Sequence, residues 1–125
     1  MKLAIIESPL GSKPDGTRCT PQEMAENLVY ARACMRDSLR RGEAPYASHL
    51  LYPQVLDDAT PAERKQGMEA GFAWAEAAAI ARGITSIVAV YVDRGITTGM
   101  LEGIERHKRN GLEIVKRRLG GGWAQ

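Results

Sequence analysis

The sequence has few of the features that mark membrane, secreted or metal-binding proteins. No apolar run approaches the roughly 20 residues that span a bilayer, and residues 1–6 are too short for the apolar part of an export signal. Only 2 of the 125 residues are cysteines, and Cys19 and Cys34 share no metal-ligand spacing with each other or with His49 and His107. We therefore expect a cytoplasmic protein with reduced thiols, no membrane span, no signal peptide and no metal site.

Common phosphate-binding and nucleophile motifs are also missing. The chain has no Walker loop, no Gly-x-Gly-x-x-Gly fingerprint and no Gly-x-Ser-x-Gly turn, and we expect no cofactor. The formal net charge is only +2. Basic residues cluster between positions 106 and 118, a pattern more typical of a solvated face than of a nucleic-acid surface. A nucleic-acid partner is therefore not expected.

Short β-branched runs alternate with amphipathic segments along the chain. Helices are expected after Thr20-Pro21 and Thr60-Pro61, each with a glutamate at the third helical position as in a capping box. Gly71, in the middle of the second helix, predicts a close contact, because glycine costs a helix about 1 kcal/mol relative to alanine. Strands are expected at 2–6, 45–49, 84–92 and 112–117; the second helix should end near 82, and a third should run from about 97 to 110.

This order of elements predicts a single α/β domain over residues 1–119. Strands that alternate with helices favour a four-stranded parallel sheet, here in the order 2-1-3-4, with helices on both faces. Residues 120–125, which contain three consecutive glycines and Trp123, are expected to form a flexible tail.

The stretch 91–105 combines the end of a buried strand, a polar turn and a hydroxyl-capped helix start. In a parallel sheet such a junction lies at the carboxyl edge, where ligands bind. Free N–H groups at the helix start favour an anion, and Gly99 lets a ligand approach the backbone. The alternative is an ordinary N-cap on an ordinary helix. The predicted ligand contacts in this stretch are Tyr91, Thr97, Thr98, Gly99 and Met100.

Polar side chains also follow the first two predicted strands, and these ends should share one edge of the sheet. Carboxylates with tyrosines and an imidazole suit glycosyl transfer, in which one carboxylate attacks the anomeric carbon. The alternatives are a core role for His49, a packed turn at Tyr52, and a solvated face for the helix that carries Arg64. The candidate catalytic carboxylates are Glu7, Asp93 and Glu69, and the further candidate ligand contacts are Ser8, Pro9, Ser48, His49, Tyr52 and Arg64.

Three short segments stand at these positions. They are Ile-Glu-Ser-Pro (6–9), His-Leu-Leu-Tyr-Pro (49–53) and Gly-Ile-Thr-Thr-Gly-Met (95–100). Together they resemble the nucleoside 2-deoxyribosyltransferase-like superfamily, above all its small, often phage-borne, uncharacterised members, over about residues 3–118. The resemblance implies a Rossmann-like three-layer sandwich, a homo-oligomer with sites near subunit contacts, and a nucleoside or nucleotide ligand. In the true transferases a glutamate attacks C1′ of the deoxyribose, and a second base replaces the first.

The sequence departs from the superfamily pattern at two positions. Leu10 stands where a tyrosine is often found, and Gly103 stands where the nucleophilic glutamate is expected. Glu7 is then the first choice for the carboxylate, because it ends the first strand. The sequence predicts a protein that binds a nucleoside or nucleotide, with or without N-glycosidic cleavage or deoxyribosyl transfer. The alternatives are a non-catalytic protein that sequesters a nucleotide-derived signal, as in viral anti-defence, and a structural oligomer with an empty cleft.

Overall fold

The four strands of the computed structural model, which describes residues 1–81 and 86–123, form one parallel sheet. Their order is β2-β1-β3-β4, so the predicted order 2-1-3-4 is confirmed. In the register, Leu3 lies opposite Ala44 on one side and Ser86 on the other. The strands are β1 (Leu3–Glu7), β2 (Ala44–Tyr46), β3 (Ser86–Tyr91) and β4 (Glu113–Arg117).

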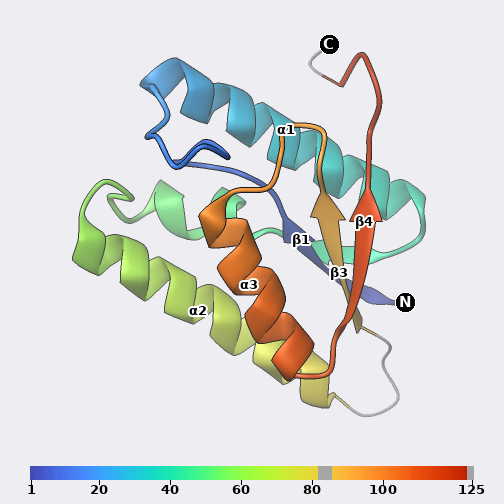
Figure 1. Cartoon of the computed structure of the whole chain (residues 1–125). Coiled ribbons are helices and arrows are strands. Elements are labelled where there is room, and N and C mark those ends of the chain that lie inside the picture. The colour runs from blue at the N-terminus through green and yellow to red at the C-terminus, as the bar shows by residue number, and fades with distance from the viewer. Residues whose placement is uncertain (82–85, 124–125) are drawn as a thin grey trace.

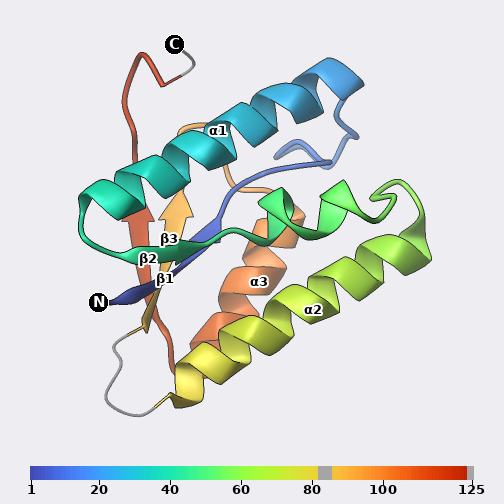
Figure 2. The ribbon, with the colours of Figure 1, turned by 180° about the vertical axis from the view of Figure 1, so that it is seen from behind.

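Helices cover both faces of the sheet, which makes the α/β sandwich that the alternation predicts (Figures 1 and 2). Helix α1 (Pro21–Arg40) packs on one face, where Tyr30 and Cys34 are buried against Ala4 and Ile6. On the opposite face, α2 (Pro61–Ile80) and α3 (Thr98–Arg109) enclose a second cluster around Ile5, Val88 and Val90. Alternate strand residues point to opposite faces, so β1, β3 and β4 each contribute to both clusters.

The second strand is shorter than predicted. It ends at Tyr46, and the chain then forms two 3-10 helices, η1 (Ser48–Leu50) and η2 (Tyr52–Gln54). Local bonds such as Leu50 N–H to the Ala47 carbonyl replace the ladder of the predicted strand 45–49. Ser48, His49 and Tyr52 therefore belong to helical turns that follow β2 and lie between α1 and α2 (Figure 2).

The two predicted capping boxes differ in outcome. At α1, the Thr20 hydroxyl accepts from the Glu23 N–H at 3.1 Å and the Thr20 N–H donates to Glu23 at 3.0 Å, so that box is confirmed. At α2 the prediction is wrong, because the Thr60 hydroxyl donates to Asp57 at 3.0 Å and leaves the helix N–H groups uncapped by it. The Glu63 side chain also bonds outside the predicted box, because its carboxylate accepts from the Asp57 N–H at 3.4 Å.

The segment after β4 continues beyond the end of that strand and passes α1 (Figure 1). Trp123, which the sequence assigns to a flexible tail, packs edge to face on Tyr30 with the ring centroids 4.9 Å apart. The predicted strand start at Ile84 and helix end at Arg82 lie outside the described residues. No helix within the described part of the chain is both long and apolar enough to cross a membrane.

Candidate functional site

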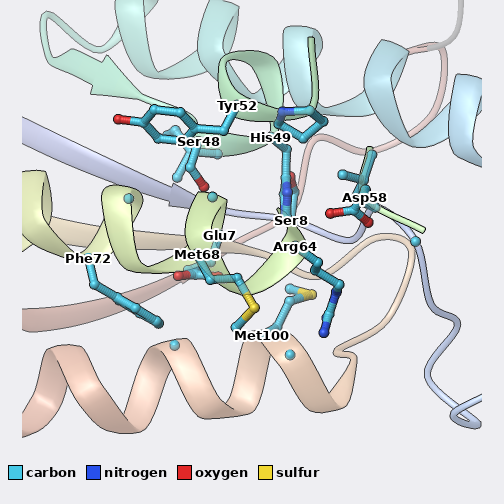
Figure 3. A pocket seen from close by; sticks show the side chains of 18 of the residues that line it. Glu7, Ser8, Ser48, His49, Tyr52, Asp58, Arg64, Met68, Phe72 and Met100 are labelled. Carbon is cyan, nitrogen blue, oxygen red and sulfur yellow. The ribbon is translucent and has the colours of Figure 1, made fainter. Parts of the chain in front are cut away.

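A cavity opens where β1 ends, on the face of the sheet that α2 and α3 cover (Figure 3). Four parts of the chain line it: the end of β1 with the residues after it, the 3-10 turns with the loop that follows them, α2, and α3 from its N-cap to His107. The cavity therefore lies at the carboxyl edge of the sheet, where ligands bind in parallel α/β folds. The predicted site residues that line it are Glu7, Ser8, Ser48, His49, Tyr52, Arg64, Thr97, Gly99 and Met100.

The Glu7 carboxylate lies against the backbone of α3. A Cβ atom added at Gly103 would come within 2.7 Å of Glu7 Oε1, so a side chain at position 103 and this carboxylate cannot share the space. Glu7 is only partly exposed, and its Oε1 lies 3.1 Å from the Nε2 atom of His107. A carboxylate from the strand thus occupies the space beside the α3 backbone at Gly103.

His107 is a site residue that the sequence reasoning missed. Its ring is buried between the sheet and α3, with Phe72 packed edge to face at a centroid distance of 5.7 Å. The sequence feature that could have revealed His107 is its helical spacing, because it lies on the same face of α3 as the other buried residues. The buried residues of this helix are Met100, Gly103, Ile104 and His107. A polar ring on the apolar stripe of an amphipathic helix has to find a partner, and here the partner is Glu7.

Ser8 and His49 form the part of the cavity next to Glu7. Ser8 is 1% exposed, and its hydroxyl finds no hydrogen-bond partner among the described residues. Desolvation lowers the pKa of the His49 ring, and the nearby Arg64 adds to this, whereas Glu7 and Asp58 oppose it. The lowered pKa favours the neutral ring, which can donate one hydrogen bond and accept another.

The wall opposite the strand end is built from α2 and the 3-10 turns. At Gly71 a Cβ atom would lie 3.1 Å from the Ser48 Cβ atom, which confirms the close contact predicted at this glycine. The hydroxyls of Tyr46 and Tyr52 lie 3.0 Å apart. The pKa of Tyr46 is raised mainly by burial and further by the hydrogen bond to Tyr52. Met68 and Phe72 extend from α2 towards α3 and add an apolar surface to the cavity (Figure 3).

Arg64 reaches from α2 over the first turn of α3. Its Nη2 atom lies 3.5 Å from the place that a Cβ atom of Gly99 would take. Among the described residues no carboxylate lies within ion-pair distance of this guanidinium. Thr97 caps the helix by accepting from the Met100 N–H at 3.1 Å. This is the ordinary N-cap that the sequence allowed as the alternative at this position. A cation and the partly positive end of a helix therefore face the same opening.

Five predicted site residues lie outside this cavity: Pro9, Glu69, Tyr91, Asp93 and Thr98. Tyr91 points to the α1 face, because it stands one residue after Val90 in β3, and its hydroxyl donates to Asp37 at 2.7 Å. Asp93 accepts from the Tyr30 hydroxyl at 2.6 Å and from the Leu119 N–H at 2.9 Å, which makes it a structural carboxylate.

The other three residues lie on other surfaces of the protein. Glu69 forms an exposed ion pair with Arg106 at 3.2 Å. Thr98 is exposed, because it lies about 100° further round the helix than Thr97. Pro9 lines a shallow hollow near Lys13 and Arg94 on the α1 side. In contrast, Asp58 lines the cavity although its irregular loop contains no sequence signal for a site.

Within residues 1–81 and 86–123, no group of three or more His, Cys, Asp or Glu side chains is placed to hold a metal ion. Comparison with known proteins finds no match among curated proteins and none among solved structures. Residues 2–117 match the profile of a family described as a domain of unknown function, DUF7768. Because this match spans nearly the whole chain, the protein belongs to the DUF7768 family.

Proposed function

We propose that the cavity binds a nucleoside or nucleotide and that Glu7 is the carboxylate that meets the anomeric carbon of its sugar. The observation that carries the proposal is the placement of Glu7. Its carboxylate lies inside a cavity at the sheet edge, together with the His49 ring and with the Ser8 hydroxyl, which has no hydrogen-bond partner within the described part of the chain. Hydroxyl and carboxylate groups around one recess favour a polyhydroxylated ligand such as a ribose.

The rest of the cavity suits the other two parts of such a ligand. Met68, Phe72 and Met100 offer an apolar surface of the kind on which a base packs. Arg64 stands over the start of α3 without an ion-pair partner among the described residues. A phosphate there would receive charge-assisted bonds from the guanidinium and from free backbone N–H groups.

Cleavage of an N-glycosidic bond would proceed through Glu7 in two steps. A carboxylate oxygen forms a bond to C1′ while the C1′–N bond breaks, and the electron pair of that bond passes to the base, which takes a proton from solvent. Water or a second base then attacks C1′ and releases the carboxylate. The lowered pKa of His49 disfavours its charged form, so we assign the proton to solvent rather than to this ring.

The test combines ligand discovery with one substitution. Mass spectrometry of molecules carried by the gently purified protein identifies candidates, and calorimetry with deoxynucleosides and nucleoside monophosphates measures binding. Chromatography of the same mixtures detects released base. We expect Glu7→Gln to abolish base release while binding persists, and Glu69→Gln, an exposed carboxylate outside the cavity, to behave as the wild type.

Two results would change the proposal. Base release that is undiminished in Glu7→Gln excludes Glu7 as the reacting carboxylate. Tight binding without release from any ligand supports the sequestering protein instead, an alternative that Gly103 favours because the helix lacks the expected glutamate. Absence of binding across the whole panel removes the nucleoside proposal.

A further inference from the structure

We infer that Gly103 and His107 are positioning residues that hold the Glu7 carboxylate with one oxygen bonded and the other free for the ligand. The inference deepens the proposed function, since it concerns the same carboxylate. It rests on geometry that exists in the protein without a ligand, so it is tested separately from turnover. The two residues lie four positions apart, one turn along the buried face of α3.

The first step concerns the space at Gly103. Its φ is not in the left-handed region, so the backbone itself does not require glycine. Alanine would favour the helix more strongly. However, a Cβ atom would lie 2.7 Å from Glu7 Oε1, 3.2 Å from its Cδ and 3.3 Å from its Oε2. The whole carboxylate therefore rests where the side chain of residue 103 would be, and glycine is the residue that permits it.

The second step concerns the hydrogen bond. His107 is 2% exposed, its Nε2 lies 3.1 Å from Glu7 Oε1, and its Nδ1 has no partner among the described residues. A carboxylate accepts and cannot donate, so the proton of a neutral ring belongs on Nε2. A proton on Nδ1 would leave a buried N–H unpaired and would face the carboxylate with a second acceptor. His107 therefore donates to Oε1, and Oε2 keeps its lone pairs for a ligand.

The third step concerns rigidity. Glu7 is the last residue of β1 and pairs with Val90 of the central strand β3, so its backbone is fixed by the sheet. The His107 ring is held in turn by Phe72 of α2. The Glu7 side chain is fixed by the sheet at its backbone and by His107 at its carboxylate, so the carboxylate varies little in position. This matters because misplacement of a reacting group by about 1 Å lowers rates roughly a hundredfold.

The experiment compares three variants in the ligand-free protein. Gly103→Ala fills the space, His107→Met removes the donor, and His107→Gln keeps an N–H donor at the reach of Nε2. The readout is the 13C signal of the Glu7 carboxyl group, assigned with Glu7→Gln. We expect this signal to move in Gly103→Ala and His107→Met and to stay near its wild-type position in His107→Gln. Leu101→Ala, on the exposed side of α3, is the control and should leave it unchanged.

Turnover supplies the second readout. On any nucleoside that the wild type cleaves, we expect Gly103→Ala and His107→Met to lower kcat about tenfold or more, with KM little changed, and His107→Gln to recover most of the loss. The inference is overturned if folded Gly103→Ala and His107→Met leave the Glu7 signal in place, or if His107→Gln fails as completely as His107→Met. If no nucleoside is cleaved, the Glu7 carboxyl signal alone tests the positioning. The lack of turnover then counts against the proposed function only.

Discussion

Among the described residues Arg64 is the only lysine or arginine that lines the cavity, and it has no ion-pair partner there. Arg106 on α3, by contrast, is paired with Glu69 and Glu76. An unpaired guanidinium beside the start of a helix attracts an anion, and a phosphate is the anion that a nucleotide offers. Arg64 is thus the residue expected to distinguish nucleotides from nucleosides.

We expect Arg64→Gln to lower the affinity for a nucleoside monophosphate about tenfold or more, because each charge-assisted bond contributes roughly 1.5–3 kcal/mol. Affinity for the corresponding nucleoside should change little. Calorimetry with the matched pair of ligands measures the difference, and Arg36→Gln, an exposed arginine of α1, serves as the control. An equal loss for both ligands would show that Arg64 does not read the phosphate.

Arg117 belongs to the basic cluster of the sequence but faces inwards. Its guanidinium donates to both carboxylate oxygens of Glu43, at 2.7 and 2.6 Å, and the two side chains are 8% and 9% exposed. Hydrogen bonds from Arg117 hold the pKa of Glu43 below its ordinary value of 4.5. A carboxyl group with a depressed pKa stabilises the folded state above its ordinary pKa, and this contribution is lost as the pH falls through the lowered value.

We expect Glu43→Gln to destabilise the protein by about 3–5 kcal/mol at pH 7, because it leaves a buried guanidinium without its counter-charge. The double variant Glu43→Leu/Arg117→Met should be less destabilised than this, and its stability should depend less on pH below 4.5 than that of the wild type. Denaturant unfolding at neutral and acidic pH measures both effects. A double variant as unstable as Glu43→Gln would contradict the account.

Helix α2 contacts the rest of the protein through small residues. Gly71 and Ala75 are its buried positions, and Gly71 lets the helix backbone approach Ser48. This approach brings the η1 turn and α2 together on one side of the cavity. The distance between these two elements therefore depends on the absence of a side chain at one position.

We expect Gly71→Val to destabilise the protein by about 1–3 kcal/mol through overpacking and to weaken ligand binding by moving Ser48. Ala73→Val, at an exposed position two residues further along the same helix, controls for the lower helix propensity of valine. Chemical denaturation and calorimetry report the two effects. Equal stability of the two variants would show that the contact at Gly71 tolerates a larger side chain.

The outer face of α2 leaves large apolar side chains in solvent. Trp74 is 64% exposed and Ile80 is 82% exposed, and alanines stand beside them at 73 and 77. Apolar patches of this kind on small proteins commonly mark interfaces. We propose that the protein is a homo-oligomer, at least a dimer, with this face of α2 in the contact.

Light scattering at micromolar concentration should therefore give a mass of at least twice 13.7 kDa. Trp74→Glu is expected to shift the protein to the monomer, because a carboxylate cannot be buried in an apolar contact without a large cost. Leu39→Glu, which changes a similarly exposed apolar residue on α1, should leave the mass unchanged. A wild-type mass near 13.7 kDa would contradict the proposed assembly.

Much of the fold is encoded in short-range patterns that can be read along the chain. Alternation of β-branched runs with helical segments predicts the parallel sheet and its order, because right-handed crossovers leave few other arrangements. The capping box at Thr20 and the close contact at Gly71 follow from local chemistry. The box at Thr60 fails for a reason beyond its four residues, since Asp57 in the preceding loop competes for the hydroxyl.

Only part of the candidate site could be predicted from the sequence. The face of the sheet on which a side chain lies depends on the register of the sheet, which the sequence does not give. Glu7 and Tyr91 are the last residues of β1 and β3, yet one enters the cavity and the other is buried under α1. The role of His107 depends on a partner 100 residues away in the sequence. The sequence by itself determined the elements, their order and a polar sheet edge. Only the tertiary structure decided that a strand carboxylate occupies the space left by Gly103, because that space exists only once α3 packs on the sheet.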